Sequence, residues 1–131
     1  MRLLVTGAGG FVGRPLCREL AHRGYRVRAA MRTRGQLSAD GETVTVGDVD
    51  AATKWADALK GVDTVMHLAA RVHVMKDKSA DPLTEYLKVN LYGTANLARQ
   101  AADAGVRRLV YVSSVKVNGE STGEQPFAET D

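Results

Sequence analysis

The sequence predicts an α/β fold built on a doubly wound parallel sheet, and three observations predict it. Short apolar runs typical of buried strands alternate with segments of helical periodicity along the 131-residue chain. A glycine-rich turn follows the first apolar run at once. Glycine and polar residues fall where strands are expected to end, which is the edge at which open parallel sheets bind ligands. We expect the strand order 3-2-1-4-5, with helices on both faces.

The first strand is expected at residues 2–6 and the first helix at residues 11–23, with a glycine turn between them. Apolar residues recur near the helical period after that turn. Pro15 lies near the first helical turn, where its missing N–H costs least. The run His22-Arg23-Gly24 supplies the cations and the glycine that favour the end of a helix.

Four further strands are expected at residues 25–31, 43–46, 64–68 and 108–113. A short helix is expected at residues 53–59 and a long one at residues 83–104, each followed by a glycine, and the polar tail 118–131 is expected as loop. The long helix is expected to carry one apolar face made by Leu83, Leu87, Leu91, Thr94, Leu97, Ala98 and Ala101. Residues 1–131 therefore form one predicted domain.

Composition limits the classes to which this chain can belong. With 44% hydrophobic and 25% charged residues it is ordinary for a globular domain. No apolar run is long enough for a transmembrane helix and no apolar leader precedes the first strand, so we expect a cytoplasmic protein. The single cysteine, Cys17, excludes a disulfide within the chain and is interpreted as a small buried helix residue. No metal site is expected.

Charge gives little support to a nucleic-acid partner. The formal net charge is +3, and five arginines lie between Arg23 and Arg34, a cluster of the kind that binds phosphate backbones. Aromatic residues amount to only 5% of the chain, and acidic and basic residues are mixed elsewhere. We therefore expect no nucleic-acid binding.

The glycine turn is the first candidate binding site. Gly7, Gly10 and Gly13 follow Gly-x-x-Gly-x-x-Gly spacing, which overlaps only in part, through Gly9, with the Gly-x-Gly-x-x-Gly of many dehydrogenases. Glycines let the backbone approach a pyrophosphate, whose charge then lies against the free N–H groups of the following helix. A strand-to-helix turn without a ligand is the alternative. The strand before and the helix after favour binding.

Five motifs follow one another along the chain: Thr6-Gly-Ala-Gly-Gly-Phe-Val-Gly13, Gly47-Asp-Val-Asp50, His67-Leu-Ala-Ala70, Val89-Asn-Leu-Tyr-Gly-Thr94 and Tyr111-Val-Ser-Ser114. This succession resembles the N-terminal half of the extended short-chain dehydrogenase/reductase family. The resemblance is greatest to its NAD-dependent nucleotide-sugar epimerase/dehydratase branch, which includes the UDP-sugar 4-epimerases, and it covers essentially the whole chain. It implies a Rossmann domain that binds NAD, a nucleotide-sugar substrate and, for the intact enzyme, a homodimer.

The resemblance implies cofactor-binding roles at the glycine turn and at the ends of later strands. Asp48 matches the aspartate that accepts a hydrogen bond from the adenine amino group, and Val49 packs beside that ring. A solvated turn aspartate is the alternative at Asp48. The other implied positions contact the pyrophosphate, line the ribose and nicotinamide, or support the site: Gly7, Gly10, Phe11, Val12, Gly13, Leu68, Ala69, Ala70, Asn90 and Ser113.

Ser114 is the candidate catalytic residue. It matches the serine or threonine that, in the family, binds the sugar hydroxyl to be oxidised, and a serine that merely closes a strand is the alternative. His67 is interpreted as a packed histidine at a strand end rather than a proton carrier, and His22 and His73 as surface residues. Asn90 is expected to tie the long helix to nearby backbone, since a buried amide must be hydrogen-bonded.

The sequence departs from the family in its catalytic base. That base is a tyrosine in a Tyr-x-x-x-Lys helix, and none of the 4 tyrosines here has a lysine four residues later. Residues 126–131 resemble the segment just before that helix, and the family's substrate domain is missing. We therefore interpret the chain as an N-terminal fragment. It is expected to be inactive alone, and the usual dimer is in doubt for it.

A second departure concerns the end of the second strand. The family usually places there an acid that binds the adenosine ribose hydroxyls, whereas this chain has Met31 followed by Arg32. Arg32 or Arg34 could hold the 2′-phosphate of NADP, because guanidinium groups suit phosphate oxygens. The alternative, which we favour slightly, is that both arginines are solvated and NAD binds through its other contacts.

The resemblance leaves three functions open. The first is a nucleotide-sugar epimerase or dehydratase. Residues 71–81 and 114–120 resemble a bacterial subgroup that makes surface-polysaccharide precursors. The second is an NADPH-dependent ketone reductase of the same family, which Arg32 would favour. The third is a cofactor-sensing module without enzyme activity.

Overall fold

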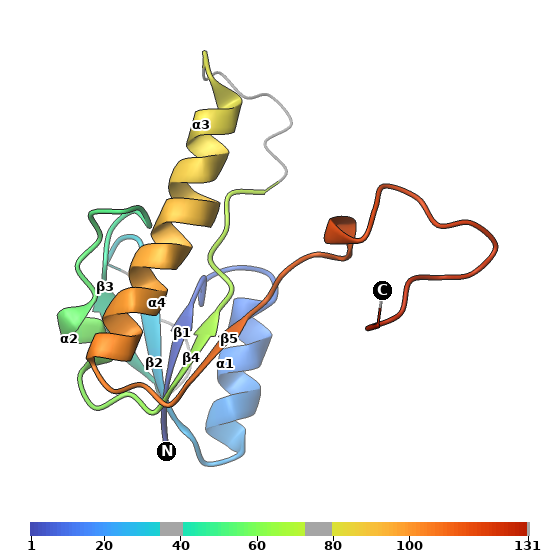
Figure 1. Cartoon of the computed structure of the whole chain (residues 1–131). Coiled ribbons are helices and arrows are strands. Elements are labelled where there is room, and N and C mark those ends of the chain that lie inside the picture. The colour runs from blue at the N-terminus through green and yellow to red at the C-terminus, as the bar shows by residue number, and fades with distance from the viewer. Residues whose placement is uncertain (35–40, 73–79, 131) are drawn as a thin grey trace.

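A computed structural model describes residues 1–34, 41–72 and 80–130. Its centre is a parallel sheet of order β3-β2-β1-β4-β5 (Figure 1), which confirms the predicted fold class and strand order. The strands are β1 (Arg2–Thr6), β2 (Arg26–Met31), β3 (Glu42–Thr45), β4 (Thr64–His67) and β5 (Arg108–Tyr111). The helical elements are α1 (Gly13–His22), α2 (Ala56–Leu59), α3 (Pro82–Tyr86), the π-helical segment Leu87–Gly93, α4 (Thr94–Asp103) and the 3₁₀ turn Val115–Val117.

The sheet is covered on both faces, and neighbouring residues of β1 divide between them. Leu4 belongs to the cluster formed with α2 and α4, whereas Val5 belongs to the cluster formed with α1. Such alternation follows from the two-residue period of a strand. The α2–α4 cluster is the larger and contains the fully buried Trp55 and Leu97. The α1 cluster contains Cys17, which confirms its interpretation as a buried helix residue, and burial raises the pKa of its thiol.

The predicted long helix is interrupted and only partly buried. Residues 87–93 form a π-helical segment between α3 and α4. Leu97 and Ala101 of α4 pack on the sheet, but Leu83 and Leu91 remain 67% and 51% exposed. The expectation of one continuous apolar face was therefore wrong, because α3 extends past the edge of the sheet and has no strand beneath it (Figure 1).

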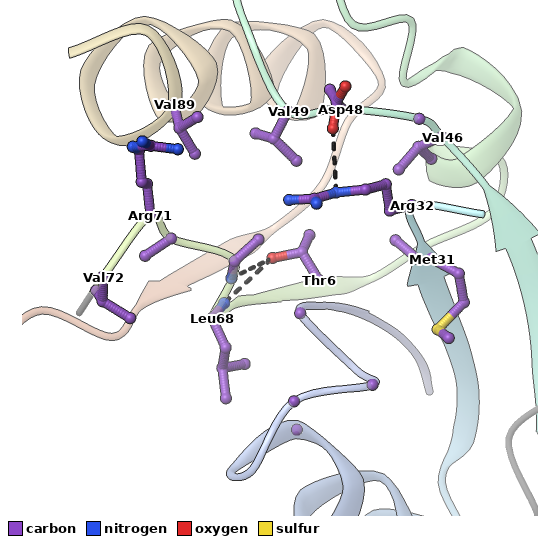
Figure 2. A pocket seen from close by; sticks show the side chains of 18 of the residues that line it. Thr6, Met31, Arg32, Val46, Asp48, Val49, Leu68, Arg71, Val72 and Val89 are labelled. Carbon is purple, nitrogen blue, oxygen red and sulfur yellow. Dashed lines mark hydrogen bonds and ion pairs between the residues drawn. The ribbon is translucent and has the colours of Figure 1, made fainter. Parts of the chain in front are cut away.

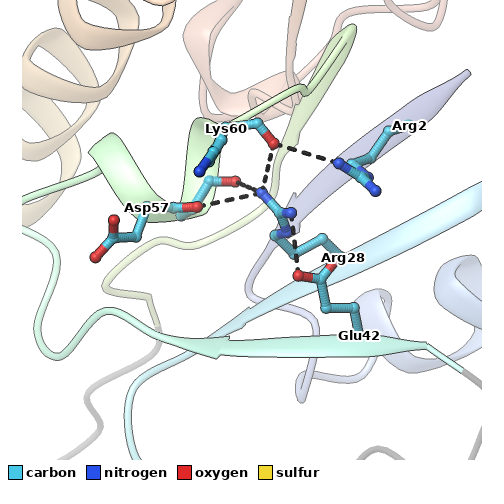
Figure 3. Close-up of polar contacts among 6 residues, drawn as sticks. Arg2, Arg28, Glu42, Asp57 and Lys60 are labelled. Atoms are coloured by element: carbon cyan, nitrogen blue, oxygen red, sulfur yellow. Dashed lines mark hydrogen bonds and ion pairs between the residues drawn. The ribbon is translucent and has the colours of Figure 1, made fainter.

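Arg28 ties three elements together near the amino ends of the strands (Figure 3). It is buried on β2, its Nη1 donates to the carbonyls of Asp57, Ala58 and Lys60 at 3.2, 2.7 and 2.9 Å, and its Nη2 lies 3.0 Å from Glu42 Oε1 on β3. Because the last carbonyls of a helix lack partners within the helix, this guanidinium caps α2. The carboxyl end of α2 is thereby tied to the sheet.

No helix in the described ranges is long and apolar enough to cross a membrane.

Two helices, α1 and α2, start later in the sequence than predicted. The predicted helix 53–59 starts at Ala56, because the Thr53 hydroxyl instead donates to the Asp48 carbonyl at 2.7 Å and closes the preceding loop. The first helix starts at Gly13, because the Gly10 N–H donates to the Gly7 carbonyl at 2.9 Å and makes a turn.

Candidate functional site

A cavity of about 650 Å³ opens at the carboxyl ends of β1, β2 and β4 and beside the loop that follows β3 (Figure 2). It lies where the connections from neighbouring strands β1 and β4 leave toward opposite faces, which is the usual ligand site of such sheets. Eleven of the predicted cofactor positions line it: Gly7, Gly10, Phe11, Val12, Gly13, Arg32, Asp48, Val49, Leu68, Ala69 and Ala70. The structure thus brings together segments that are far apart in the sequence.

The glycine turn is packed so tightly that two of its glycines cannot carry a side chain. Gly7 has φ +65°, and a Cβ there would lie 2.9 Å from the backbone nitrogen of Ala69. A Cβ on Gly13 would lie 2.1 Å from the Gly7 carbonyl oxygen. The turn therefore brings the start of α1 against the ends of β1 and β4.

The N-terminus of α1 faces the cavity. Its N-cap residue, Val12, makes no side-chain capping hydrogen bond, and Phe11 to Gly13 line the cavity wall. The first N–H groups of a helix have no partners within the helix, and its dipole favours negative charge there. The start of α1 can therefore receive an anionic group without displacing a capping side chain.

Arg32 and Asp48 meet across one side of the cavity (Figure 2). Arg32 follows β2, Asp48 lies in the loop after β3, and Arg32 Nε lies 3.0 Å from Asp48 Oδ1. Their side chains are 78% and 74% exposed, so solvent screens the pair. The preceding residue, Met31, packs its side chain toward Gly9, where a Cβ would lie 3.3 Å from the methionine Cε.

A buried hydrogen-bonded chain connects β1, β4 and α4 behind the cavity. Thr6 Oγ1 accepts the N–H groups of Leu68 and Ala69, each at 3.1 Å, and lies 2.7 Å from His67 Nδ1. His67 Nε2 lies 2.9 Å from Thr94 Oγ1. Because the Thr6 oxygen already accepts two bonds, its hydroxyl proton goes to Nδ1, which leaves the proton of the neutral ring on Nε2.

His67 is fully buried, which confirms its interpretation as a packed histidine. Its ring stacks on Tyr111 with centroids 5.7 Å apart. Burial lowers the pKa of His67 to about 4, because the charged ring would lose its solvation. The Thr6–His67–Thr94 chain thus contains a neutral imidazole at ordinary pH and fixes the backbone of residues 68 and 69 at the cavity wall.

Asn90 ties the π-helical segment to the loop after β4, as predicted. Its Oδ1 accepts the Arg71 N–H at 2.8 Å, and its Nδ2 donates to the Arg71 carbonyl at 3.0 Å. Asn90 does not itself line the cavity, although its neighbours Lys88 and Val89 do. Gly93 of the same segment approaches Val49, where a Cβ would lie 2.8 Å from the valine Cγ1. The segment therefore contacts the loops after both β3 and β4.

The two serines after β5 lie apart from the cavity. Ser113 and Ser114 are exposed and are not among its described lining residues. Ser114 Oγ accepts the Lys116 N–H at 3.3 Å and caps the 3₁₀ turn. The catalytic role of Ser114 and the cofactor role of Ser113 stay predictions.

Sequence reasoning missed several cavity residues. Trp55, the single tryptophan, lines the cavity although it is fully buried, and its indole N–H has no hydrogen-bond partner among the described residues. Val46 also lines the cavity, and its place directly after a strand could have indicated it. Thr6 was treated only as the start of the glycine turn, and its hydroxyl contacts could not be read from the sequence. Of the two other histidines, His22 is exposed as predicted and His73 lies outside the described residues.

The described residues contain no group of three or more histidine, cysteine or acidic side chains suited to a metal ion. What they offer is a cavity with an uncapped helix start, a glycine cradle, a carboxylate and apolar walls. Such a combination suits an elongated ligand with a phosphate centre and a flat ring at its end.

Comparison with known proteins agrees with this geometry. The model of the NAD dependent epimerase/dehydratase family matches residues 3–131. The chain is 48% identical over 121 residues to the UDP-glucose 4-epimerase of Vibrio cholerae, with 92% of this chain and 37% of that protein covered. It is 40% identical over 121 residues to the 3-beta-hydroxysteroid dehydrogenase of Mycolicibacterium neoaurum, with 88% and 32% covered.

Among solved structures, MoeE5 in complex with UDP-glucose and NAD superimposes with a TM-score of 0.80 at 36% identity, over 100% of this chain and 42% of that one. The chain thus spans well under half the length of these relatives. The family model and the identities agree with the resemblance inferred from the five motifs. The chain belongs to the NAD dependent epimerase/dehydratase family.

Proposed function

We propose that this chain is the cofactor-binding part of an NAD-dependent enzyme that acts on a nucleotide sugar, as UDP-sugar 4-epimerases do. One observation carries the proposal: the glycine turn, the uncapped start of α1 and Asp48 line a single cavity at the carboxyl edge of the sheet. The similarity to a UDP-glucose 4-epimerase, and to a structure that contains UDP-glucose and NAD, supports the same substrate class.

The residues of the cavity fit a dinucleotide. The glycine turn and the first N–H groups of α1 would hold the pyrophosphate, because no capping side chain competes for them. Asp48 would accept from the adenine amino group, between the apolar side chains of Val46 and Val49. Residues 68–70 would lie along the nicotinamide side, held there by Thr6. When bound, the nicotinamide supplies the hydride acceptor and donor for a sugar carbon.

In the intact enzyme we propose that Ser114 orients the sugar hydroxyl, as its match to the family serine implies. A tyrosine that this chain does not contain would remove the hydroxyl proton, since no tyrosine of this chain fits the family's catalytic pattern. Return of the hydride to the other face of the sugar would give the epimer. We propose that the product is a precursor of a surface polysaccharide.

A second candidate is an NADPH-dependent ketone reductase or hydroxysteroid-type dehydrogenase of the same family. The observation that favours it is that the cavity wall has Met31, followed by the cation Arg32, at the place where the family usually has an acid. The similarity to a 3-beta-hydroxysteroid dehydrogenase is consistent with that candidate.

Titration of this chain with NAD tests the proposed function. Trp55, the only tryptophan, lines the cavity and gives a fluorescence signal, and calorimetry gives an independent one. We expect saturable binding, and about tenfold weaker binding for Asp48→Ala, because a charge-assisted hydrogen bond is lost. Asp103→Ala, an exposed acid at the end of α4, is the matched control and should bind NAD like the unaltered chain. A folded chain that does not bind NAD would overturn the proposal.

A further inference from the structure

The loop after β3 rests on one face of α4 and on Gly93, the N-cap residue of that helix. Gly93, Asn96 and Gln100 follow one another at spacings of three and four residues, so they lie on the same side of the helix. A Cβ on Gly93 would lie 2.8 Å from Val49 Cγ1. The loop brings Asp48 and Val49 into the cavity wall, whereas the three residues beneath it are not among the described lining residues.

The side-chain amides of Asn96 and Gln100 bind the backbone of this loop. Asn96 is only 4% exposed, and its Nδ2 donates to the carbonyls of Asp50 and Thr53 at 3.1 and 2.8 Å. Gln100 Nε2 donates to the same Thr53 carbonyl at 2.9 Å and to Asn96 Oδ1 at 2.8 Å. Gln100 Oε1 accepts the N–H of Trp55 at 2.9 Å. Each amide nitrogen thus uses both of its hydrogens, and a buried network whose polar groups are paired is rigid.

Thr53 connects this network to Asp48. Its Oγ1 accepts the N–H of Asp50 at 2.8 Å and donates to the carbonyl of Asp48 at 2.7 Å. Thr53 is 6% exposed, whereas the side chain of Asp48 is 74% exposed. The backbone of the loop is therefore held from the protein interior, while the Asp48 carboxylate lies at the surface of the cavity.

We propose that Asn96, Gln100 and Thr53 are positioning residues, which hold the Asp48 carboxylate where it selects a purine that carries an amino group. This role rests on the proposed dinucleotide-binding function. A carboxylate accepts hydrogen bonds and cannot donate them, so it favours the amino group of adenine over the carbonyl oxygen of hypoxanthine. The preference depends on the place of the carboxylate, because a hydrogen bond weakens steeply as its geometry worsens. A carboxylate on a loosened loop would turn away from the carbonyl oxygen, and the preference would be lost.

Parallel calorimetric titrations with NAD and with nicotinamide hypoxanthine dinucleotide test this role, because the second ligand has a carbonyl oxygen in place of the amino group. We expect the unaltered chain to bind NAD about tenfold more tightly. Thr53→Val keeps the shape of the side chain but removes the hydroxyl. It should weaken NAD binding about fivefold and binding of the hypoxanthine analogue less than about twofold, so the affinity ratio falls. Thr53→Ser, which keeps the hydroxyl, should restore the ratio, whereas a residue that only stabilised the fold would weaken both ligands alike.

Thr64→Val is the matched control. Thr64 is also buried, at 9% exposed, but it lies at the amino end of β4 and is not among the described lining residues. This variant should leave the affinity ratio unchanged. Gln100→Met serves if Thr53→Val does not fold, since it removes one of the two donors to the Thr53 carbonyl and keeps the threonine hydroxyl. It should lower the ratio about twofold.

The outcomes separate this role from the function on which it rests. If the unaltered chain prefers NAD and neither Thr53→Val nor Gln100→Met lowers that preference, the positioning role is overturned while the dinucleotide site stands. An equal loss of preference in Thr64→Val would overturn it too. If the unaltered chain binds both dinucleotides equally, Asp48 does not select the amino group and the positioning role fails. If the folded chain binds neither, the proposed function fails and the positioning role fails with it.

Discussion

At the scale of single residues, His67 shows how a titratable group can serve the site without taking part in proton transfer. Its two ring nitrogens are both occupied, by Thr6 and Thr94, and Thr6 in turn holds the N–H groups of Leu68 and Ala69. A proton added to the ring would leave Nδ1 facing a hydroxyl whose oxygen already accepts two bonds. The neutral ring is therefore the form that the cavity wall requires.

This arrangement predicts a loss of stability in acid. The pKa of His67 is about 4 in the folded chain against 6.5 as its ordinary value. Between these values the unfolded chain binds a proton that the folded chain does not, so the free energy of unfolding falls as pH drops from 6.5 toward 4. The contribution of His67 to the free energy of unfolding falls by roughly 3 kcal/mol over this range, and above pH 6.5 that contribution is constant.

Urea unfolding between pH 8 and pH 4.5 measures this effect. We expect His67→Gln to be less stable than the unaltered chain at neutral pH but to depend less on pH below about 6.5. His22→Gln, at an exposed histidine, should reproduce the unaltered curve. Parallel curves for the unaltered chain and His67→Gln would contradict the assignment.

At the scale of elements, the sequence predicted which residues come together at the cavity better than it predicted the helices around it. The strand positions and the glycine turn follow local rules of apolar patterning and backbone freedom, so eleven of the predicted cofactor positions do line one cavity. The π-helical segment does not follow from local rules, because its side-chain pattern resembles that of an α-helix. The segment contacts residues that are distant in the sequence, through Asn90 with Arg71 and through Gly93 with Val49, and local patterning does not reveal such contacts.

Charged residues inside strands were also beyond sequence reasoning. Arg28 belongs to the arginine cluster that was weighed as a phosphate-binding feature, yet it is buried, and the carbonyls to which it donates lie about thirty residues later along the chain. Ser114 is a case in which the sequence indicates more than the described structure contains. Its motif indicates a catalytic serine, but the groups that would complete that site are not among the described residues.

The Arg28 contacts predict a large effect on stability with no effect on binding. Arg28→Ala would leave the carbonyls at the end of α2 without their donor, and we expect a loss of about 2–4 kcal/mol in the free energy of unfolding. Arg26→Ala, an exposed arginine on the same strand, should cost less than about 0.5 kcal/mol. Denaturant unfolding measures both, and equal losses for the two variants would contradict the capping role. The affinity of folded Arg28→Ala for NAD should equal that of the unaltered chain.

At the scale of the whole molecule, binding and turnover are expected to separate. The chain covers 37% of the Vibrio cholerae UDP-glucose 4-epimerase and contains no Tyr-x-x-x-Lys sequence. It holds the proposed cofactor site but no residue that matches the family's catalytic base.

We therefore expect this chain to bind NAD and yet not to interconvert UDP-glucose and UDP-galactose. A coupled assay for UDP-glucose formation measures this, with the Vibrio cholerae enzyme as the positive control. Sustained conversion by the 131-residue chain would show that another group supplies the base.

The Arg28 contacts and the cavity lie at opposite edges of the same sheet, the first near the amino ends of its strands and the second at their carboxyl ends. On β2, the Arg28 contacts are therefore separate from the residues that line the cavity. Substitutions of cavity residues that change the preferred ligand therefore leave the Arg28 contacts intact. Ligand specificity can diverge between related sheets of this kind while the contacts that hold α2 and β3 to β2 are inherited unchanged.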